Sequence, residues 1–343
     1  MPSIATASLQ TLGSRWFRVL AGVMSALGIA AAVFLAGPRY AAGPDTPTPR
    51  AAPPHNLQAL DPWLASQEAA HPGIKPGTAK GIVWAGATGQ RAPWAVVYLH
   101  GFSASRLETA PLTDDVAKAL GANVFYARLS GHGLPAAAMG DATLQDWLAD
   151  AREALQIGKQ LGDKVLLISC STGSTLATWL GTHGLDTQVA GHVFLSPNFG
   201  PKDPRADLLI GPWGGRIAEA ILGPDTGWTP ASDAEANAWS TRYPTRSLLP
   251  MMAMVQGVRE SDLHRFTAPV LVLYSANDRV VEPQQTLAAV ARFGSANKQI
   301  VPVDYSEAKD QHVLAGTIKA PSATDRMAQT IITWARSLPE RAP

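Results

Sequence analysis

The stretch from Lys164 to Gly184, KVLLISCSTGSTLATWLGTHG, constrains the fold of this chain more than any other. Val165 to Ser169 is a short apolar run, typical of a strand that is buried on both faces of a parallel sheet. Residues 174–180 favour a helix. A strand that becomes a helix within about four residues needs a tight, strained turn, and Ser171 stands at its apex. The stretch therefore predicts a strand–turn–helix unit that lifts a serine hydroxyl clear of the sheet.

The turn at Ser171 places its hydroxyl beside the first amides of the following helix. Free amides at the start of the following helix point toward any negative charge that forms beside it. The usual pattern for such a turn is G-x-S-x-G, and Ser169 replaces the first glycine. Because similar strings are common in chains rich in Ala, Gly and Ser, the motif alone leaves two interpretations open. Ser171 is either a nucleophile or an ordinary polar residue at a helix start.

Apolar runs alternate with helical patterns along most of the chain. Strands are expected at 80–85 (an edge strand), 94–99, 123–129, 165–169, 189–196, 269–274 and 299–303. Helices are expected from an N-cap at Asp61 to about Ala70 and at 111–120, 143–161, 174–180, 283–293 and 324–338. This alternation predicts an α/β fold with a doubly wound, mostly parallel sheet, helices on both faces and right-handed crossovers. Ligands bind such sheets at the carboxyl ends of the strands.

A second polar turn follows the strand at 94–99, which leads into His100-Gly101-Phe102-Ser103. A backbone amide just after this glycine can form one half of an oxyanion hole. We expect the amide of Phe102 to be paired there with the amide of Thr172, the residue after the turn serine. His100 is interpreted as a brace for this loop, and His132 is also given a structural role.

Two further polar residues follow the last two expected strands, Asp278 and His312. A serine hydroxyl is a poor nucleophile at neutral pH, so it needs an imidazole to accept its proton. The imidazole in turn needs a carboxylate to fix its tautomer and stabilise its charge. The chain order Ser171, Asp278, His312 therefore predicts a catalytic triad along one edge of the sheet. Asp304 and Asp310 are alternative acids; Asp278 is favoured because it directly follows a strand.

Several motifs in this chain resemble those of the α/β-hydrolase family. They are HGFS, RLSGHG, SCSTGS, SANDRVVEP and HVLAG, and the resemblance runs from Trp94 to the carboxyl terminus. Within that family they look like serine esterases and monoacylglycerol-lipase-like enzymes with a helical cap. The resemblance implies an α/β-hydrolase fold, with Asp278 as the acid after the penultimate strand and His312 as the base after the last one.

The alternation of strands and helices breaks between Asn198 and Phe266. This stretch is rich in Pro, Gly, Trp and Met and is too long for a plain loop. We therefore expect a helical cap at about 198–266, inserted before the penultimate strand. Met251, Met252 and Trp239 are predicted to offer an adaptable apolar wall to an acyl chain. The alternative is that these side chains form the core of the cap itself.

The amino-terminal residues 1–37 contain an uncharged, apolar run of nineteen residues, Val19 to Gly37, which is long enough to cross a bilayer. Arg15 and Arg18 precede it, so the amino terminus is expected in the cytoplasm and the rest of the chain on the other side. A cleaved signal peptide gives a similar pattern, but the run is longer than usual, which favours a membrane anchor. Residues 38–56 predict a Pro/Ala-rich linker before a hydrolase domain at 57–343.

Composition narrows the range of partners. The chain has 28 Lys and Arg residues against 27 Asp and Glu residues, without a basic run in its body, so nucleic acid is not an expected partner. Cys170 is the single cysteine, which excludes an internal disulfide, and no Cys/His cluster has zinc-site spacing. Cys170 is interpreted as a small buried residue and not as a nucleophile.

These observations predict a serine hydrolase that cleaves carboxylic esters, lipid or acylglycerol esters among them, through an acyl-enzyme. The reaction requires neither a metal nor a cofactor. One rival is an acyltransferase, which passes the acyl group to an alcohol. A second is a peptidase, which needs carboxylates such as Asp207, Glu219 or Asp225 to capture a substrate amine. A third is a membrane-tethered binding module without catalysis, against which the complete triad argues.

Overall fold

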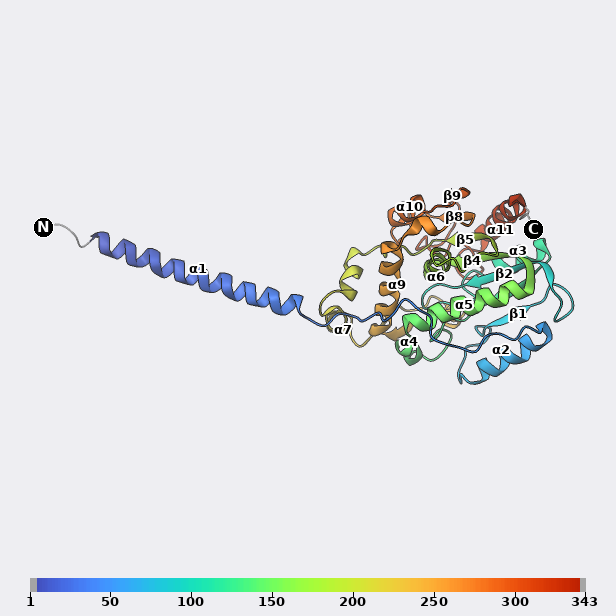
Figure 1. The fold of residues 1–343 in the computed structure, drawn as a ribbon, viewed down its shortest axis with the longest axis horizontal. Coiled ribbons are helices and arrows are strands. Elements are labelled where there is room, and N and C mark those ends of the chain that lie inside the picture. Colours follow the sequence, from blue (N-terminus) through green and yellow to red (C-terminus); the bar gives the residue numbers. More distant parts are fainter. Residues whose placement is uncertain (1–4, 340–343) are drawn as a thin grey trace.

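A seven-stranded sheet lies at the centre of the structure, a computed structural model that describes residues 5–339 (Figure 1). The strands are β1 (Gly81–Val83), β2 (Ala92–Leu99), β3 (Ala122–Tyr126), β4 (Gly162–Cys170), β5 (Val189–Leu195), β8 (Val270–Tyr274) and β9 (Lys298–Pro302). Their order in space is β1-β3-β2-β4-β5-β8-β9. Only the edge strand β1 runs antiparallel to its neighbour, and the other pairs are parallel. The predicted mostly parallel sheet is therefore confirmed.

Helices cover both faces of this sheet. On one face lie α3 (Leu112–Leu120) and α11 (Pro321–Ser337), and on the other lie α5 (Leu144–Leu161), α6 (Thr172–Thr182), α9 (Leu248–Glu260) and α10 (Pro283–Ala291). Successive strand residues alternate between the two hydrophobic cores, so that Val96 and Tyr98 pack toward α3 and α11 while Val97 and Leu99 pack toward α5. All four side chains are fully buried. The sheet is thus stabilised by apolar contacts on both faces, as the doubly wound arrangement requires.

The start of α5 follows a local sequence signal, whereas the start of α2 differs from the prediction. Thr143 and Asp146 form a capping box at the start of α5. The helix α2 (Leu60–Ala69) does not begin at an Asp61 N-cap, because a 3-10 turn at Leu57–Ala59 runs directly into it. The carboxylate of Asp61 instead accepts a hydrogen bond from the Trp84 indole at 2.9 Å.

Between β5 and β8, where a cap at about 198–266 is predicted, lies a group of short elements that we call the cap. It contains α7 (Gly214–Leu222), α8 (Asp233–Ala238), a 3-10 turn (Pro204–Ile210) and a hairpin of β6 (Asp225–Gly227) and β7 (Arg242–Pro244), and the short helix α4 (Ala137–Asp141) packs against it. The predicted range also includes α9. Two neighbouring parallel strands need a crossover from one end of the sheet to the other. Helix α9 is that crossover, and it packs on α5 and α6.

The helix α1 (Ala5–Leu35) projects away from the domain (Figure 1). Its residues 16–35 are all exposed, and Trp16–Leu35 is long and apolar enough to cross a membrane. A signal sequence and a signal anchor both fit this helix. The first four residues of the predicted 1–37 segment lie outside the described residues.

Residues 38–56, which are predicted to be a linker, form neither helix nor strand, and the first part of this segment lies against the domain. The amide of Thr48 donates to the carbonyl of Gln145 at 3.0 Å. Arg50 forms an ion pair with Asp150, a residue of α5. The Pro- and Ala-rich composition of residues 38–56 predicts a linker but does not indicate these contacts with the domain.

Candidate active site

The turn between β4 and α6 has the strained geometry that its sequence predicts. Ser171 adopts φ 50° and ψ −116°, a backbone conformation that non-glycine residues rarely adopt. Three backbone hydrogen bonds hold it there: its amide donates to the carbonyl of Leu195 at 2.9 Å, and its carbonyl accepts the amides of Ser174 at 2.9 Å and Asn198 at 3.1 Å. A Cβ atom at Gly173 would lie 2.1 Å from the carbonyl oxygen of Leu99, so this position of the motif requires glycine.

Ser169, which replaces the first glycine of the usual motif, is accommodated by a polar contact. Its side chain is fully buried and its hydroxyl lies 3.0 Å from that of Ser174. The hydroxyl also donates to the carbonyl of Val193 at 3.3 Å. The departure from G-x-S-x-G therefore leaves no orphaned polar group at the turn.

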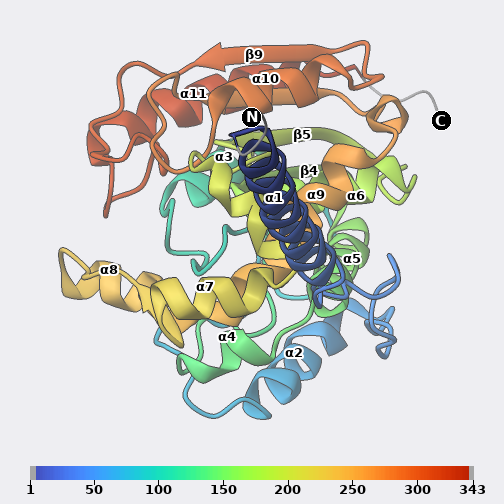
Figure 2. The same ribbon diagram turned by 90° about the vertical axis from the view of Figure 1, so that its left-hand side faces the viewer.

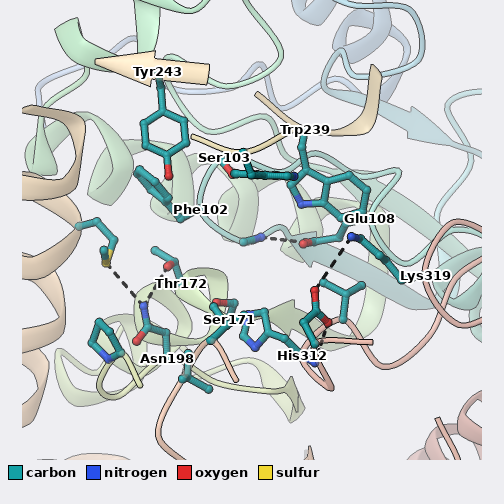
Figure 3. Close-up of a pocket in the computed structure, with 18 of the residues that line it drawn as sticks. Phe102, Ser103, Glu108, Ser171, Thr172, Asn198, Trp239, Tyr243, His312 and Lys319 are labelled. Atoms are coloured by element: carbon teal, nitrogen blue, oxygen red, sulfur yellow. Dashed lines mark hydrogen bonds and ion pairs between the residues drawn. The ribbon is translucent and has the colours of Figure 1, made fainter. Parts of the chain in front are cut away.

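The imidazole of His312 is paired with Asp278. Nδ1 of His312 lies 2.8 Å from Oδ2 of Asp278, and Oδ1 of the same carboxylate accepts the amides of Val280 and Val281 at 2.8 and 2.9 Å. With Nδ1 donating to Asp278, Nε2 is left unprotonated. Figure 3 shows the His312 ring beside Ser171, on the floor of a cavity that both residues line.

The pKa of His312 is raised above its ordinary value. Burial alone lowers the pKa of an imidazole, but the hydrogen bond and the charge of Asp278 outweigh it. Asp310 and Glu108 raise the pKa further through their charges. A base with a raised pKa accepts a proton from a serine hydroxyl more readily.

The two alternative acids are placed differently. Asp310 lines the cavity, but its carboxylate accepts the backbone amide of His312 at 3.1 Å and does not contact the ring. Asp304 is exposed at the surface. Of the three candidates, Asp278 is the residue that holds the imidazole.

The backbone of the His-Gly-Phe loop passes close to Ser171. A Cβ atom at Gly101 would lie 3.3 Å from the Cβ of Ser171. Phe102 and Thr172 both line the cavity, and within residues 5–339 their amides have no hydrogen-bond acceptor. Two unpaired amides next to a serine hydroxyl are the donors that an oxyanion needs.

Glu108 is a cavity residue that sequence reasoning missed. Its buried carboxylate accepts the amide of Gly101 at 2.8 Å and the hydroxyl of Tyr98 at 2.9 Å. Burial raises the pKa of Glu108 to about 7. The two hydrogen bonds and the charge of His312 lower this pKa, but burial outweighs them. Glu108 thus fixes the glycine that precedes the Phe102 amide. The available signal was an acidic residue in the short loop just after HGFS.

The two histidines near this loop are structural, as expected. His100 accepts the amide of Leu129 at 3.0 Å through Nε2, and its Nδ1 lies 2.8 Å from the carbonyl of Gly101. The ring of His132 packs against those of His100 and Phe102. Burial lowers the pKa of His132 to about 4 and that of His100 well below its ordinary value, so both are neutral at pH 7.

The cavity above Ser171 has a volume of about 430 Å³ and lies between the sheet edge and the cap. Trp239 and Met251, two of the three residues predicted to bind substrate, line it. Met252 does not: its side chain is fully buried in the core beneath α9, so it fits the alternative of a packing residue. Other lining side chains are Trp228, Tyr243, Leu248, Val313 and Asn198.

The acidic residues proposed for a peptidase do not reach the cavity. Asp207 pairs with Arg259 and Asp225 with Arg242 on the outside of the cap, and Glu219 is exposed. Glu235 does line the cavity, and there it forms an ion pair with Lys319. Cys170 is buried behind the turn, where burial raises its thiol pKa well above the ordinary value.

Comparison with known proteins now assigns the family. Residues 90–304 match the hydrolase family described as "Serine aminopeptidase, S33", which is more than half of the chain. The chain belongs to this family. The matched residues of this hydrolase include Ser171 and Asp278 and end before His312.

A curated relative of this hydrolase is the thermostable monoacylglycerol lipase of Bacillus sp. (strain H-257). The two sequences are 28% identical over 215 residues, which is 62% of this chain and 81% of the relative. Neither this alignment nor the family match is long enough to cover the whole chain.

Solved structures of similar proteins establish the α/β-hydrolase fold. A metagenome-derived lipolytic enzyme has a TM-score of 0.61 at 20% identity and covers 77% of this chain and 99% of its own. A soluble variant of the monoglyceride lipase of Saccharomyces cerevisiae has a TM-score of 0.58 at 13% identity, covering 77% and 92%. The monoacylglycerol lipase of Paleococcus ferrophilus has a TM-score of 0.55 at 16% identity, covering 76% and 98%.

Proposed function

We propose that this chain hydrolyses carboxylic esters with an apolar acyl chain through an acyl-enzyme on Ser171. The observation that carries the proposal is the meeting of Ser171, His312 paired with Asp278, and two unpaired amides on the floor of one largely apolar cavity. This arrangement can serve both proton transfer from the serine hydroxyl and binding of the oxyanion.

The reaction follows from the positions of the groups. Ser171 Oγ attacks the ester carbonyl while His312 Nε2 takes its proton, and the amides of Phe102 and Thr172 hold the oxyanion. The intermediate collapses, the C–O bond to the alcohol breaks, and His312 returns its proton to the leaving alcohol. Water then attacks the acyl-enzyme with His312 as base, which releases the acid and restores Ser171. Asp278 orients His312 throughout and stabilises its charged form.

The substrate we propose is a monoacylglycerol-like lipid. The curated relative named above is a monoacylglycerol lipase, and the cavity joins apolar walls to polar groups that suit an alcohol with free hydroxyls. Met251 and Trp239 offer the apolar surface. Asn198, Asp310 and the Lys319–Glu235 pair offer hydrogen-bonding groups.

We also propose that α1 stays attached as a membrane anchor and holds the catalytic domain on the non-cytoplasmic side. Trp16–Leu35 spans about 30 Å at 1.5 Å per residue, which matches the hydrocarbon thickness of a bilayer. Arg15 and Arg18 before this segment favour a cytoplasmic amino terminus.

The test is hydrolysis by the full chain in detergent, on p-nitrophenyl esters from acetyl to palmitoyl and on 1-oleoylglycerol. Ser171→Ala is the matched variant, with a loss of about 10⁴-fold or more expected. The same preparations are given an amino-acid p-nitroanilide and, separately, an acceptor alcohol. Cleavage of the anilide alone identifies a peptidase, and transfer to the alcohol in place of hydrolysis identifies an acyltransferase. If the folded protein turns over none of these substrates, the hypothesis of a binding module without catalysis is the one that remains.

A further inference from the structure

The outer end of the anchor helix touches the cap. The amide of Trp213, the residue before α7, donates to the carbonyl of Pro38 at 2.7 Å, and its indole Nε1 donates to the carbonyl of Phe34 at 3.1 Å. Gly37 is buried against the same indole, so closely that a Cβ atom at this position would lie 1.8 Å from Nε1. Anchor and cap therefore meet at the point where α1 ends.

The chain after this contact is held along the domain. We call residues 38–50 the strap. The Gln145 side chain donates to the carbonyl of Pro44 at 2.8 Å, and the Trp179 indole donates to the carboxylate of Asp45 at 2.6 Å. His183 lies 3.0 Å from the same carboxylate. Together with the Arg50–Asp150 ion pair described above, these contacts fix the strap to α5 and α6, two helices of the core. The domain is thus held in a defined orientation to α1.

The cap exposes a group of large apolar side chains beside this junction. They are Leu208 (64% exposed), Ile217 (38%), Ile221 (75%) and Leu222 (47%), from the 3-10 turn at Pro204–Ile210 and from α7. At 3.6 residues per turn, the charged residues Arg216 and Glu219 fall on the other side of α7 from Ile221. Neighbouring exposed apolar side chains of this size mark an interaction surface.

The position of the anchor identifies what this surface contacts. If Trp16–Leu35 spans the bilayer, its outer boundary lies at the level of Leu35, where the Trp213 indole sits. Tryptophan is enriched at that level of membrane proteins because its ring is apolar and its N–H is polar. In Figure 2, which looks from the side where α1 leaves the domain, α7 lies in front, beside the base of α1.

We propose that α7 and the 3-10 turn before it dock on the bilayer that α1 spans, with the strap holding the domain in this orientation. The proposal rests on the membrane anchoring proposed above. Helix α7 packs against the segment that leads into α9, where Leu248 and Met251 line the cavity, and a Cβ at Gly215 would lie 3.1 Å from the Leu249 side chain. The docked surface therefore lies next to the cavity wall, and a lipid reaches the cavity from the bilayer through the cap.

The test places single spin labels on the full chain in vesicles of phosphatidylcholine and phosphatidylglycerol. The variants are Ile221→Cys on α7, Val23→Cys on the anchor and Val83→Cys on β1, which lies on the far side of the domain from α1 (Figure 1). Val83 is 41% exposed and serves as the control. The unmodified chain controls for Cys170, which is buried. Collision rates with oxygen and with an aqueous nickel complex give the depth of each label.

We expect the label at 221 about 5–10 Å below the headgroup level, as for an interfacial helix, and the label at 83 in water. A label at 23 inside the bilayer with a label at 221 in water overturns the docking and keeps the anchor. Labels at 23 and 221 both in water overturn the docking together with the anchoring. The depth measurement needs no turnover, so it does not depend on the proposed reaction.

A second variant connects docking with activity. Ile221→Asp is expected to lower hydrolysis of 1-oleoylglycerol within the vesicles by about tenfold, because a carboxylate opposes insertion of α7. Hydrolysis of water-soluble p-nitrophenyl butyrate by the same sample should stay unchanged, since residue 221 does not line the cavity. Val83→Asp is the matched control and should change neither rate. Equal rates for Ile221→Asp and the unmodified chain on both esters would contradict entry from the bilayer.

Discussion

The sheet edge and the cap form the two sides of one cavity, yet they are built in different ways. On the sheet edge, backbone hydrogen bonds hold Ser171 at its amide and carbonyl and hold the Asp278 carboxylate through two amides, and this carboxylate holds His312. On the cap, the lining consists mainly of side chains from short elements, such as Trp239 and Tyr243. The proposed chemistry is therefore fixed by the fold, whereas substrate preference depends on side chains that can change singly.

The largest effect is expected on the sheet edge. Asp278→Asn should lower kcat/KM by about 10⁴-fold, because an amide favours the wrong tautomer of His312 and does not stabilise its charge. Asp310→Asn is the matched control. Its carboxylate accepts the backbone amide of His312 and lies 4.0 Å from Lys319 Nζ, so a loss below about tenfold is expected. Steady-state kinetics of both variants decide this, and equal losses would contradict Asp278 as the acid.

The second prediction concerns Glu108, which lies behind the sheet edge. Glu108→Ala should lower kcat by about 10²-fold with little change in KM, because Gly101 loses its acceptor and the Phe102 amide loses its position. Glu108→Gln keeps an oxygen acceptor and should restore most of the rate. Circular dichroism checks that both variants are folded. A rate for Glu108→Gln as low as that for Glu108→Ala would show that the carboxylate acts in another way.

The third prediction is the pH dependence. The base must be neutral to accept the serine proton, so the rate falls about tenfold per pH unit below the pKa of His312. Since Asp278 raises this pKa, we expect the acidic limb of kcat/KM to begin above about pH 6.5, the ordinary value for histidine. A rate that stays flat to pH 4 would exclude His312 as the base.

The smallest effects are expected on the cap, where two neighbouring methionines make a direct comparison. Met251 lines the cavity, so Met251→Ala should shift the preferred acyl length with a rate change below about tenfold. Met252 is fully buried in the core, so Met252→Ala should leave the preference unchanged and lower the free energy of unfolding by about 2–5 kcal/mol. Chain-length profiles and urea unfolding separate the two effects. Reversed results would show that the cavity wall lies elsewhere.

The strands, most helices and the side chains that meet at the sheet edge were predictable from the sequence. Parallel strands buried on both faces are short apolar runs, and their carboxyl ends share one edge, so sequence order alone brings Ser171, Asp278 and His312 near one another. The small and polar residues that follow these strands indicated where the candidate site lies.

The rest depends on contacts between residues far apart in sequence. Glu108 acquires its role from Gly101 and Tyr98, and nothing in its own segment indicates that its carboxylate is buried. The predicted cap included α9 because the whole stretch 198–266 is rich in Pro, Gly, Trp and Met, whereas the parallel pairing of β5 and β8 makes this helix a crossover. The strap reads as a linker because its partners lie on or next to α5 and α6, about a hundred residues or more away in the sequence.

The ends of the cap have a consequence for how such an enzyme can be changed. Asn198, just before the cap, lies 3.5 Å from the sulfur of Met251, just after it. A segment of about fifty residues thus leaves and re-enters the domain at nearly one point, which is the condition under which whole modules are exchanged without loss of a fold. Evolution or protein engineering can therefore replace the cap as a unit and change the substrate specificity while the catalytic residues on the sheet edge stay the same.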